Sequence, residues 1–208
     1  MKQLTLLVVA LFTTLATSGT APAGSYAAPL SAVERSMLQG TLYAQPRPAF
    51  GLALPSTTGG DIHLHDLQGK VVLLFFGYTY CPDVCPTTLA DIKQAFAQPG
   101  INADEVAVLF VTVDPARDTI ARLTEFLGFF HEPSLIGIRG NDAQTAALAY
   151  QYGAKFYREE GTTATGGYSM AHTTRLYLIN RQSEWVMTVP WGTSPEQLAL
   201  DLRYWLAQ

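Results

Sequence analysis

The chain has 208 residues, of which 17 are acidic and 13 are Lys or Arg, so its formal net charge is −4 at pH 7. The basic residues form no cluster, which excludes the positively charged surface typical of nucleic-acid-binding proteins. A chain of this length can bury a hydrophobic core in one domain and does not depend on disulfides for stability. It contains only two cysteines, Cys81 and Cys85.

The first residues have the pattern of a secretory signal peptide. Lys2 precedes an apolar run from Leu4 to Ala16, and small residues follow at Ala21–Ala23, where a signal peptidase can cleave. The run is shorter than the roughly 20 apolar residues of a membrane-spanning helix. We therefore predict that residues 1–23 are a cleaved signal peptide and that the protein is periplasmic. The alternative is an uncleaved anchor that holds the domain at the inner membrane, facing the periplasm.

The next segment separates this signal from a folded domain. Residues 24–47 are rich in Ala, Ser, Gly and Pro, which predicts a flexible tether leading to a domain at residues 48–208. Near the start of the domain, the turn sequence TTGG and the alternation in DIHLHDL predict a β-hairpin. Alternation places His63 and His65 on one face of its second strand. We expect both to be solvated; a metal role for the pair is the alternative.

Buried strands alternate with helices through the rest of the domain. The run KVVLLFFGY predicts a strand buried on both faces, and VAVLFVTVD at residues 106–114 predicts a second one. The segment TTLADIKQAFAQPG between them predicts a helix that ends at Gly100. Further helices are predicted at residues 120–130, 143–153 and 194–208, and two adjoining strands at residues 173–180 and 184–190.

Two of these helices begin with recognisable capping boxes. Asn141 with Gln144 predicts one, and Ser194 with Gln197 predicts the other, where Pro195 occupies the first helical position. The order of strands and helices, with an antiparallel strand pair near the end, predicts an α/β fold. We expect a thioredoxin-like three-layer sandwich with a central mixed sheet and an N-terminal β-hairpin.

The two cysteines lie where such a fold places its functional crevice. Cys81 follows the first buried strand, and Cys85 lies in the first turn of the next helix, whose N-terminus favours thiolates over thiols. A structural disulfide here would close a loop of about five residues and contribute only about 2 kcal/mol. The pair is therefore either a redox dithiol or a soft-metal site, and the spacing allows both.

His172 is a candidate third ligand. It directly precedes the predicted strand at residues 173–180. In a thioredoxin-like sheet that strand lies beside the cysteine strand, so the imidazole can approach the sulfurs. Two thiolates and one imidazole form a soft, low-coordinate set that suits Cu(I), whereas structural zinc normally takes four ligands. An isolated histidine is more often a core or surface residue, and this alternative stays open on spacing alone.

Three segments, FGYTYCPDVCPTTL, VTVDPARDT and HTTRLYLIN, resemble the Sco/SenC family in order and separation, and the likeness covers residues 48–208. The resemblance implies a thioredoxin-fold copper protein of cytochrome c oxidase assembly, with Cys81, Cys85 and His172 as ligands of Cu(I) or Cu(II). Such a protein delivers copper to the dinuclear copper site of an oxidase subunit or another cuproprotein, or reduces the cysteines of that site. Further partners are a copper donor or a thiol reductant. Family members often carry an acidic residue before the histidine, where this chain has Ala171.

The segment DPARD belongs to the same resemblance. We expect Asp114, Arg117 and Asp118 to brace the loop near the site by hydrogen bonds and ion pairing among themselves. The alternative is a loop-and-cap motif remote from the metal. Met170 can offer a thioether two residues before His172, but we expect it to pack in the core.

A second functional hypothesis is a thiol–disulfide oxidoreductase or redox sensor, in which Cys81 attacks and Cys85 resolves. Thioredoxin-type oxidoreductases place a proline before the strand beside their cysteines, where this chain has His172–Thr174. That difference favours metal binding over catalytic exchange, and the copper-chaperone hypothesis assigns the protein no enzymatic activity. A peroxidase of the same fold would need a PxxxTxxC pattern, which neither cysteine matches.

Overall fold

The computed structural model describes residues 36–161 and 167–208; the predicted signal peptide and the first half of the predicted tether lie outside these ranges. An eight-stranded sheet has the order β1-β10-β9-β4-β5-β6-β2-β3. Its β4–β5 and β5–β6 pairs are parallel and its other pairs antiparallel, so the sheet is mixed. The strands are β1 (Thr41–Pro48), β2 (Ala53–Ser56), β3 (Gly60–His63), β4 (Val71–Gly77), β5 (Val106–Thr112), β6 (Leu135–Ile138), β9 (Leu176–Ile179) and β10 (Glu184–Val189).

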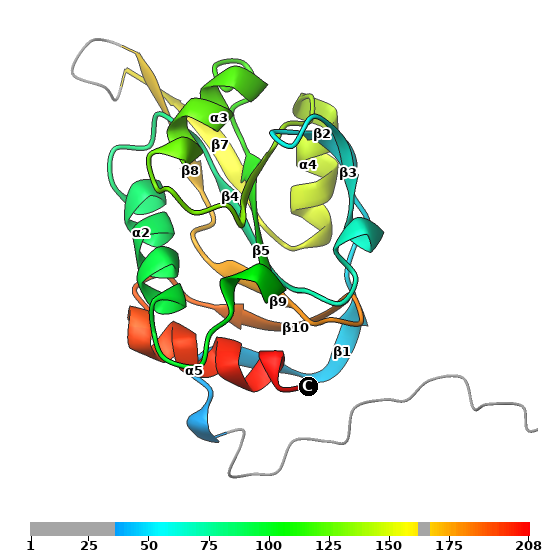
Figure 1. Ribbon diagram of the computed structural model, residues 1–208. Coiled ribbons are helices and arrows are strands. Elements are labelled where there is room, and N and C mark those ends of the chain that lie inside the picture. The colour runs from blue at the N-terminus through cyan, green and yellow to red at the C-terminus, as the bar shows by residue number, and fades with distance from the viewer. Residues whose placement is uncertain (1–35, 162–166) are drawn as a thin grey trace, which may run out of the picture.

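Helices cover both faces of the sheet (Figure 1). Two of them, α2 (Val84–Phe96) and α5 (Pro195–Leu206), pack against each other on one face, and α4 (Asp142–Gln151) lies on the other. This confirms the predicted three-layer arrangement. The remaining elements are α3 (Ile120–Gly128), the short 3-10 helices η1 (Leu64–Leu67) and η2 (Ala103–Glu105), and a separate two-stranded sheet of β7 (Phe156–Glu160) and β8 (Tyr168–His172).

The central strand β4 explains how the sheet holds its layers together. All seven of its residues are buried, as the continuous apolar run predicts. Successive side chains point to opposite faces: the Phe75 ring lies 5.8 Å from that of Phe110, while the Phe76 ring lies 5.9 Å from that of Tyr177. Burying one such side chain contributes about 1.5–3 kcal/mol. Both helical layers therefore pack against the strand that leads into the cysteine loop.

The helix starts agree with the sequence. Asn141 accepts a hydrogen bond from the backbone amide of Gln144, whose side chain bonds the Asn141 amide in return. Ser194 and Gln197 form the same capping box at α5. Each box satisfies backbone donors that a helix leaves unpaired, and replacing such a cap with alanine typically costs about 1 kcal/mol. The predicted hairpin is also confirmed, as β2 pairs with β3.

The tether prediction is wrong for residues 41–47. They form most of β1, which pairs with β10 at the edge of the sheet. This polar segment joins the sheet because Tyr43 packs edge-on against Trp185, with ring centroids 4.7 Å apart. The guanidinium carbon of Arg47 lies 4.4 Å from the centroid of the Tyr43 ring. Cation–π and aromatic contacts thus replace the apolar alternation that strands usually show.

Smaller differences concern the boundaries of several elements; the strand predicted at residues 173–180, for example, begins only at Leu176. His65 lies in η1 rather than on the strand with His63, and the two rings stack at 4.9 Å. Helix α2 ends at Phe96, before Gly100, and β5 ends at Thr112 rather than at residue 114. The short strand β6 adds an unpredicted neighbour to β5, since four residues are too few for a clear periodic pattern.

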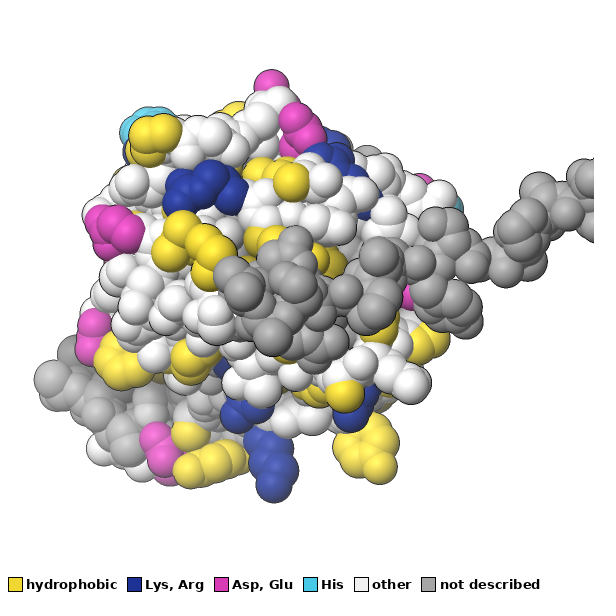
Figure 2. Space-filling view, turned by 90° about the horizontal axis from the view of Figure 1, so that it is seen from below, with side chains coloured by type: hydrophobic (Ala, Val, Ile, Leu, Met, Phe, Trp, Pro, Cys, Tyr) yellow, Lys and Arg dark blue, Asp and Glu magenta, His cyan; other side chains and the backbone are white. Residues whose placement is uncertain are grey.

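None of the helices in the described part of the chain combines the length and hydropathy of a bilayer-spanning segment. Figure 2 shows the face below the view of Figure 1. Where grey atoms do not cover it, hydrophobic side chains form separate groups among basic and acidic ones. Most large apolar side chains instead lie in the core around the central strands.

Candidate metal centre

The cysteine loop connects the end of β4 to the start of α2. Cys81 is half-buried in the loop, and Cys85 is the second residue of the helix and fully buried. The Asp83 side chain makes no capping hydrogen bond at the N-cap. Instead, the backbone amide of Cys85 donates to Cys81 Sγ at 3.4 Å. The Cys81 sulfur thus accepts one of the unpaired amides at the positive end of the helix dipole.

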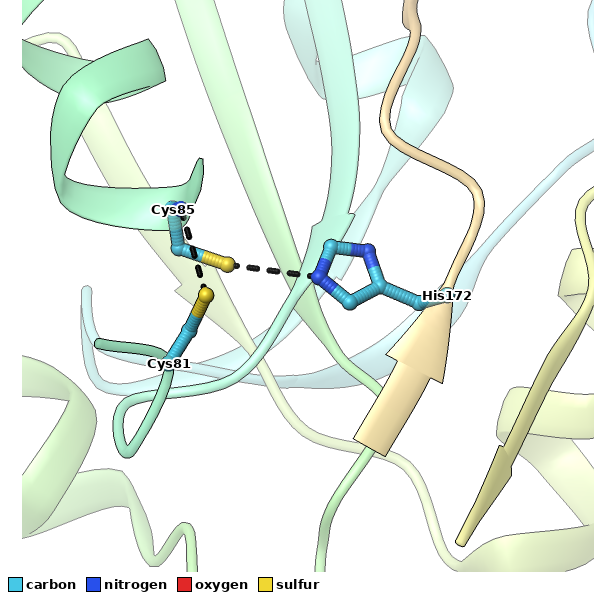
Figure 3. Close-up of side chains that lie close together, drawn as sticks. All are labelled: Cys81, Cys85 and His172. Atoms are coloured by element: carbon cyan, nitrogen blue, oxygen red, sulfur yellow. Dashed lines mark hydrogen bonds between the residues drawn. The ribbon is translucent and has the colours of Figure 1, made fainter. Parts of the chain in front are cut away.

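His172 ends β8 and turns its ring toward the two sulfurs (Figure 3). Its Nε2 lies 3.5 Å from Cys85 Sγ, and the three donor atoms of Cys81, Cys85 and His172 all lie within 4.8 Å of one another. Its Nδ1 lies 3.1 Å from the carbonyl oxygen of Thr173. When Nδ1–H donates to that carbonyl, the Nε2 lone pair faces the sulfurs and is free to bind a metal.

The packing around the imidazole keeps this orientation. The rings of Tyr78 and Phe75 meet the His172 ring edge-on, at centroid distances of 5.8 and 6.1 Å. Both aromatic residues are buried and belong to β4 or the loop after it. Met170 packs against the core, as predicted. The strand that leads into the cysteine loop, together with the first residue of that loop, therefore also packs against the histidine ring.

The two thiols differ in their ionisation. A hydrogen bond from Cys85 is the main cause that lowers the pKa of Cys81 to about 4, and two backbone amides, together with His172 when its Nε2 carries a proton, lower this pKa further, against the effect of burial. Burial is the main cause that raises the pKa of the Cys85 thiol, and the neighbouring Cys81 sulfur raises this pKa further. The surroundings therefore favour the thiolate at Cys81 and the protonated thiol at Cys85.

The donor set fits a soft, low-coordinate metal ion. Two sulfurs and one imidazole nitrogen are the ligand types that copper(I) accepts. The one candidate metal group in the described residues lacks the fourth protein ligand that structural zinc needs.

The Cys85 sulfur packs against the backbone of Gly77, which has no side chain: a Cβ on Gly77 would lie 2.9 Å from Cys85 Sγ and 2.7 Å from the Phe110 ring. The glycine thus leaves the space in which the sulfur sits.

Asp118 contacts the cysteine loop rather than Arg117. Its carboxylate accepts hydrogen bonds from the backbone amide of Thr79 at 3.0 Å and from the hydroxyls of Thr79 and Thr112, both at 2.6 Å. Burial raises the pKa of this carboxyl, and these three donors oppose the shift. Thr79 lies two residues before Cys81, so the buried carboxylate ties the loop to the end of β5.

The other two residues of the DPARD segment do form the expected ion pair. Arg117 Nε donates to Asp114 Oδ2, and Arg117 Nη1 donates to the carbonyl oxygen of Tyr168 at 3.0 Å. The Tyr168 hydroxyl in turn donates to Asp114 Oδ1 at 2.9 Å. Sequence reasoning missed Tyr168, Thr79 and Thr112, because a tyrosine or threonine in a strand or loop carries no local signal of such long-range contacts.

A hollow opens beside His172. It has a volume of about 390 Å³, and its walls include the side chains of Arg175, Trp191 and several threonines. The Trp191 side chain is exposed. His172 lines this hollow and Cys81 is half-buried, so neither of these two candidate ligands is sealed inside the core.

Comparison with known proteins identifies the family. The family model described as SCO1/SenC matches residues 47–207. The chain belongs to the SCO1/SenC family. A SCO2-like protein of Rickettsia conorii is 30% identical over 155 residues, which cover 70% of this chain and 75% of the relative.

Solved SCO1/SenC structures share the fold. Bradyrhizobium japonicum ScoI with copper bound is 37% identical, with a TM-score of 0.66, and the match covers 76% of this chain and 99% of that one. Apo Sco1 of Thermus thermophilus is 32% identical, with a TM-score of 0.68, and the match covers 80% and 96% of the two chains. The SCO1/SenC match begins at residue 47, the second-last residue of β1.

Proposed function

We propose that this protein is a periplasmic copper metallochaperone. Copper binds to Cys81, Cys85 and His172 and is delivered to the dinuclear copper site of cytochrome c oxidase or to another cuproprotein. The convergence of the three donor atoms within 4.8 Å carries the proposal. Membership of the SCO1/SenC family and the likeness to a copper-bound ScoI support it. The signal-peptide pattern of residues 1–23 supports export to the periplasm.

The site has the properties that a copper carrier needs. The Cys81 thiolate is ready to bind copper, and binding at Cys85 releases that thiol's proton. Cys81 is the more exposed sulfur, so a ligand of the recipient can reach the metal from its side. Three protein ligands leave copper open to this incoming ligand. Copper can therefore pass to the recipient by stepwise ligand exchange, without ever being released to water.

A transfer experiment tests the proposal. Purified protein loaded with Cu(I) under anaerobic conditions is mixed with a copper-free oxidase fragment that carries the dinuclear site, and copper in each protein is measured after separation. We expect about one copper per chain before mixing and its appearance in the fragment afterwards. His172→Ala is expected to lose copper, while His65→Ala, a change at an exposed histidine outside the donor set, retains it. Wild-type protein that retains no copper would contradict the proposal.

Asp118 is proposed to hold the loop in the binding geometry. Its carboxylate fixes Thr79 by two hydrogen bonds and Thr112 by a third. Buried carboxylates with several donors hold their neighbours in place because every broken bond leaves a buried charge less solvated. Thr79 lies two residues before Cys81, and helix α2 fixes the other end of the same loop. Asp118 therefore restrains the position of Cys81 by holding Thr79.

A second candidate function is thiol–disulfide exchange with the recipient. The low pKa and greater exposure of Cys81 favour it. The Cys81 thiolate attacks a disulfide of the partner, which forms a mixed disulfide and frees one partner sulfur as a thiolate. Cys85 passes its proton to that thiolate and attacks the Cys81 sulfur, which releases the second partner sulfur as a thiolate. The two electrons come from the dithiol, which becomes a disulfide. Exchange activity that survives His172→Ala, together with copper loss in the same variant, would separate this function from copper delivery.

A further inference from the structure

His172 is carried by a hairpin that stands apart from the main sheet. Within the described residues, β7 and β8 pair with each other, with His172 opposite Phe156, and with no strand of the eight-stranded sheet. All five residues of β8 are only half-buried. An isolated two-stranded hairpin is at best marginally stable in water. The position of His172 relative to the cysteines therefore depends on what attaches this hairpin to the domain.

One attachment is at the first residue of β8, Tyr168. The Tyr168 hydroxyl donates to Asp114 Oδ1 at 2.9 Å, and Arg117 Nη1 donates to the Tyr168 carbonyl oxygen at 3.0 Å. The guanidinium carbon of Arg117 lies 3.6 Å from the centroid of the Tyr168 ring. Asp114 is buried and forms an ion pair with Arg117. Three interactions thus join one tyrosine to the loop that follows β5.

Further contacts lie along the same strand. The guanidinium carbon of Arg158, in β7, also lies 3.6 Å from the centroid of the Tyr168 ring, so this ring links the two strands of the hairpin. The backbone of Met170 hydrogen-bonds Tyr78, which lies in the cysteine loop. Tyr168, Met170 and His172 alternate along the strand and therefore share its face. That face turns toward the domain.

We propose that Tyr168, held by Asp114 and Arg117, is a positioning residue that fixes β8 so that His172 meets the two cysteine sulfurs. Tyr168 does not touch the sulfurs; it acts through the strand. Fixing the far end of a short strand limits how far its other end can swing, and a metal site with three protein ligands has no redundant ligand to replace a displaced histidine. The consequence for copper rests on the proposed function, whereas the anchoring of the hairpin does not.

The test uses Tyr168→Phe, which removes the hydroxyl and keeps the ring against both guanidinium groups. Tyr157→Phe is the matched control: the same substitution in the same hairpin, at a side chain that is 61% exposed and whose hydroxyl bonds no described residue in the structure. Hydrogen exchange of the β8 backbone amides is followed by mass spectrometry in the reduced, copper-free full-length protein, with β9 as internal reference. Copper dissociation is then measured in all three proteins by competition with a Cu(I) chelator.

In Tyr168→Phe, we expect β8 amides to exchange about ten- to a hundredfold faster than in the wild type, as loss of one charge-assisted hydrogen bond implies, and copper to dissociate faster by a similar factor. Tyr157→Phe should match the wild type in both measurements, and β9 should be unchanged in every protein. Unchanged exchange in Tyr168→Phe, equal changes in both variants, or faster exchange with unchanged copper dissociation would each overturn the inference. Wild-type protein that binds no copper would instead overturn the proposed function, and the copper-free exchange comparison would still test the anchoring of the hairpin.

Discussion

Substituting alanine for Gly77 tests how closely the Cys85 sulfur is packed. The added methyl carbon would lie 2.9 Å from Cys85 Sγ and 2.7 Å from the Phe110 ring, whereas ordinary contacts of such carbons fall at 3.4–4 Å. Both neighbours are fully buried, so neither can swing into solvent. Overpacking of this kind costs about 1–3 kcal/mol. The Cys85 sulfur is pushed out of its position, so it binds copper less well. Copper affinity should fall about tenfold for each 1.4 kcal/mol needed to bring the sulfur back into place.

Gly128→Ala is the matched control. Gly128 is the last residue of α3, and a Cβ there would meet nothing within 4 Å. Both substitutions restrict the unfolded chain alike, an effect worth about 0.4–1 kcal/mol of stabilisation, so the difference between the two variants isolates the steric cost. Urea unfolding gives that difference for the reduced, copper-free protein, and chelator competition gives the copper affinity. If Gly77→Ala is as stable as Gly128→Ala and binds copper like the wild type, the packing argument fails.

Two further predictions follow from the same site. Because the folded-state pKa of Cys81 is about 4, below its usual value near 9, its thiolate stabilises the reduced, copper-free fold fully above pH 9, and this contribution is lost as the pH falls through 4. Alkylation of Cys81 should accordingly stay near its full rate at pH 6; a rate that halves near pH 8.5 would contradict the thiolate assignment. In the wild type, both carboxylate oxygens of Asp118 accept hydrogen bonds from Thr79 and Thr112. Asp118→Asn has only one acceptor oxygen and leaves a buried donor unpaired, so the free energy of unfolding should fall by about 2 kcal/mol. The exposed Asp104→Asn should change it by less than about 0.5 kcal/mol, and equal losses in the two variants would count against the bracing role.

The parts of the fold that the sequence predicted are those with a strong local signal. The run at residues 71–77 is buried on both sides and could be recognised as a central strand because apolar residues fill every position. The capping boxes at Asn141 and Ser194 were recognisable from residue spacing alone. By contrast, β1 contains two prolines and no apolar alternation, and it joins the sheet through Tyr43 and its contact with Trp185, which lies far away in the sequence.

The same contrast applies to the site. Cys81, Cys85 and His172 are found from ligand chemistry and resemblance, and the structure brings all three together. Spacing could not show that one thiol is fully buried, and this burial keeps Cys85 protonated while Cys81 ionises. Nor could it show the role of Tyr168, because its contacts with the loop after β5 depend on how the separate hairpin folds back onto the domain. Contacts of this kind are set by tertiary packing and leave no periodic pattern.

X-ray absorption at the copper edge is the most direct test of the three-ligand centre. The measurement compares Cu(I)-loaded wild-type protein with His172→Ala and with the His65→Ala control. We predict two sulfur neighbours and one nitrogen neighbour around copper in the wild type and in His65→Ala, and loss of the nitrogen neighbour in His172→Ala. A copper environment in His172→Ala that is identical to that of the wild type would contradict the claim that the imidazole and the two sulfurs hold one metal ion together.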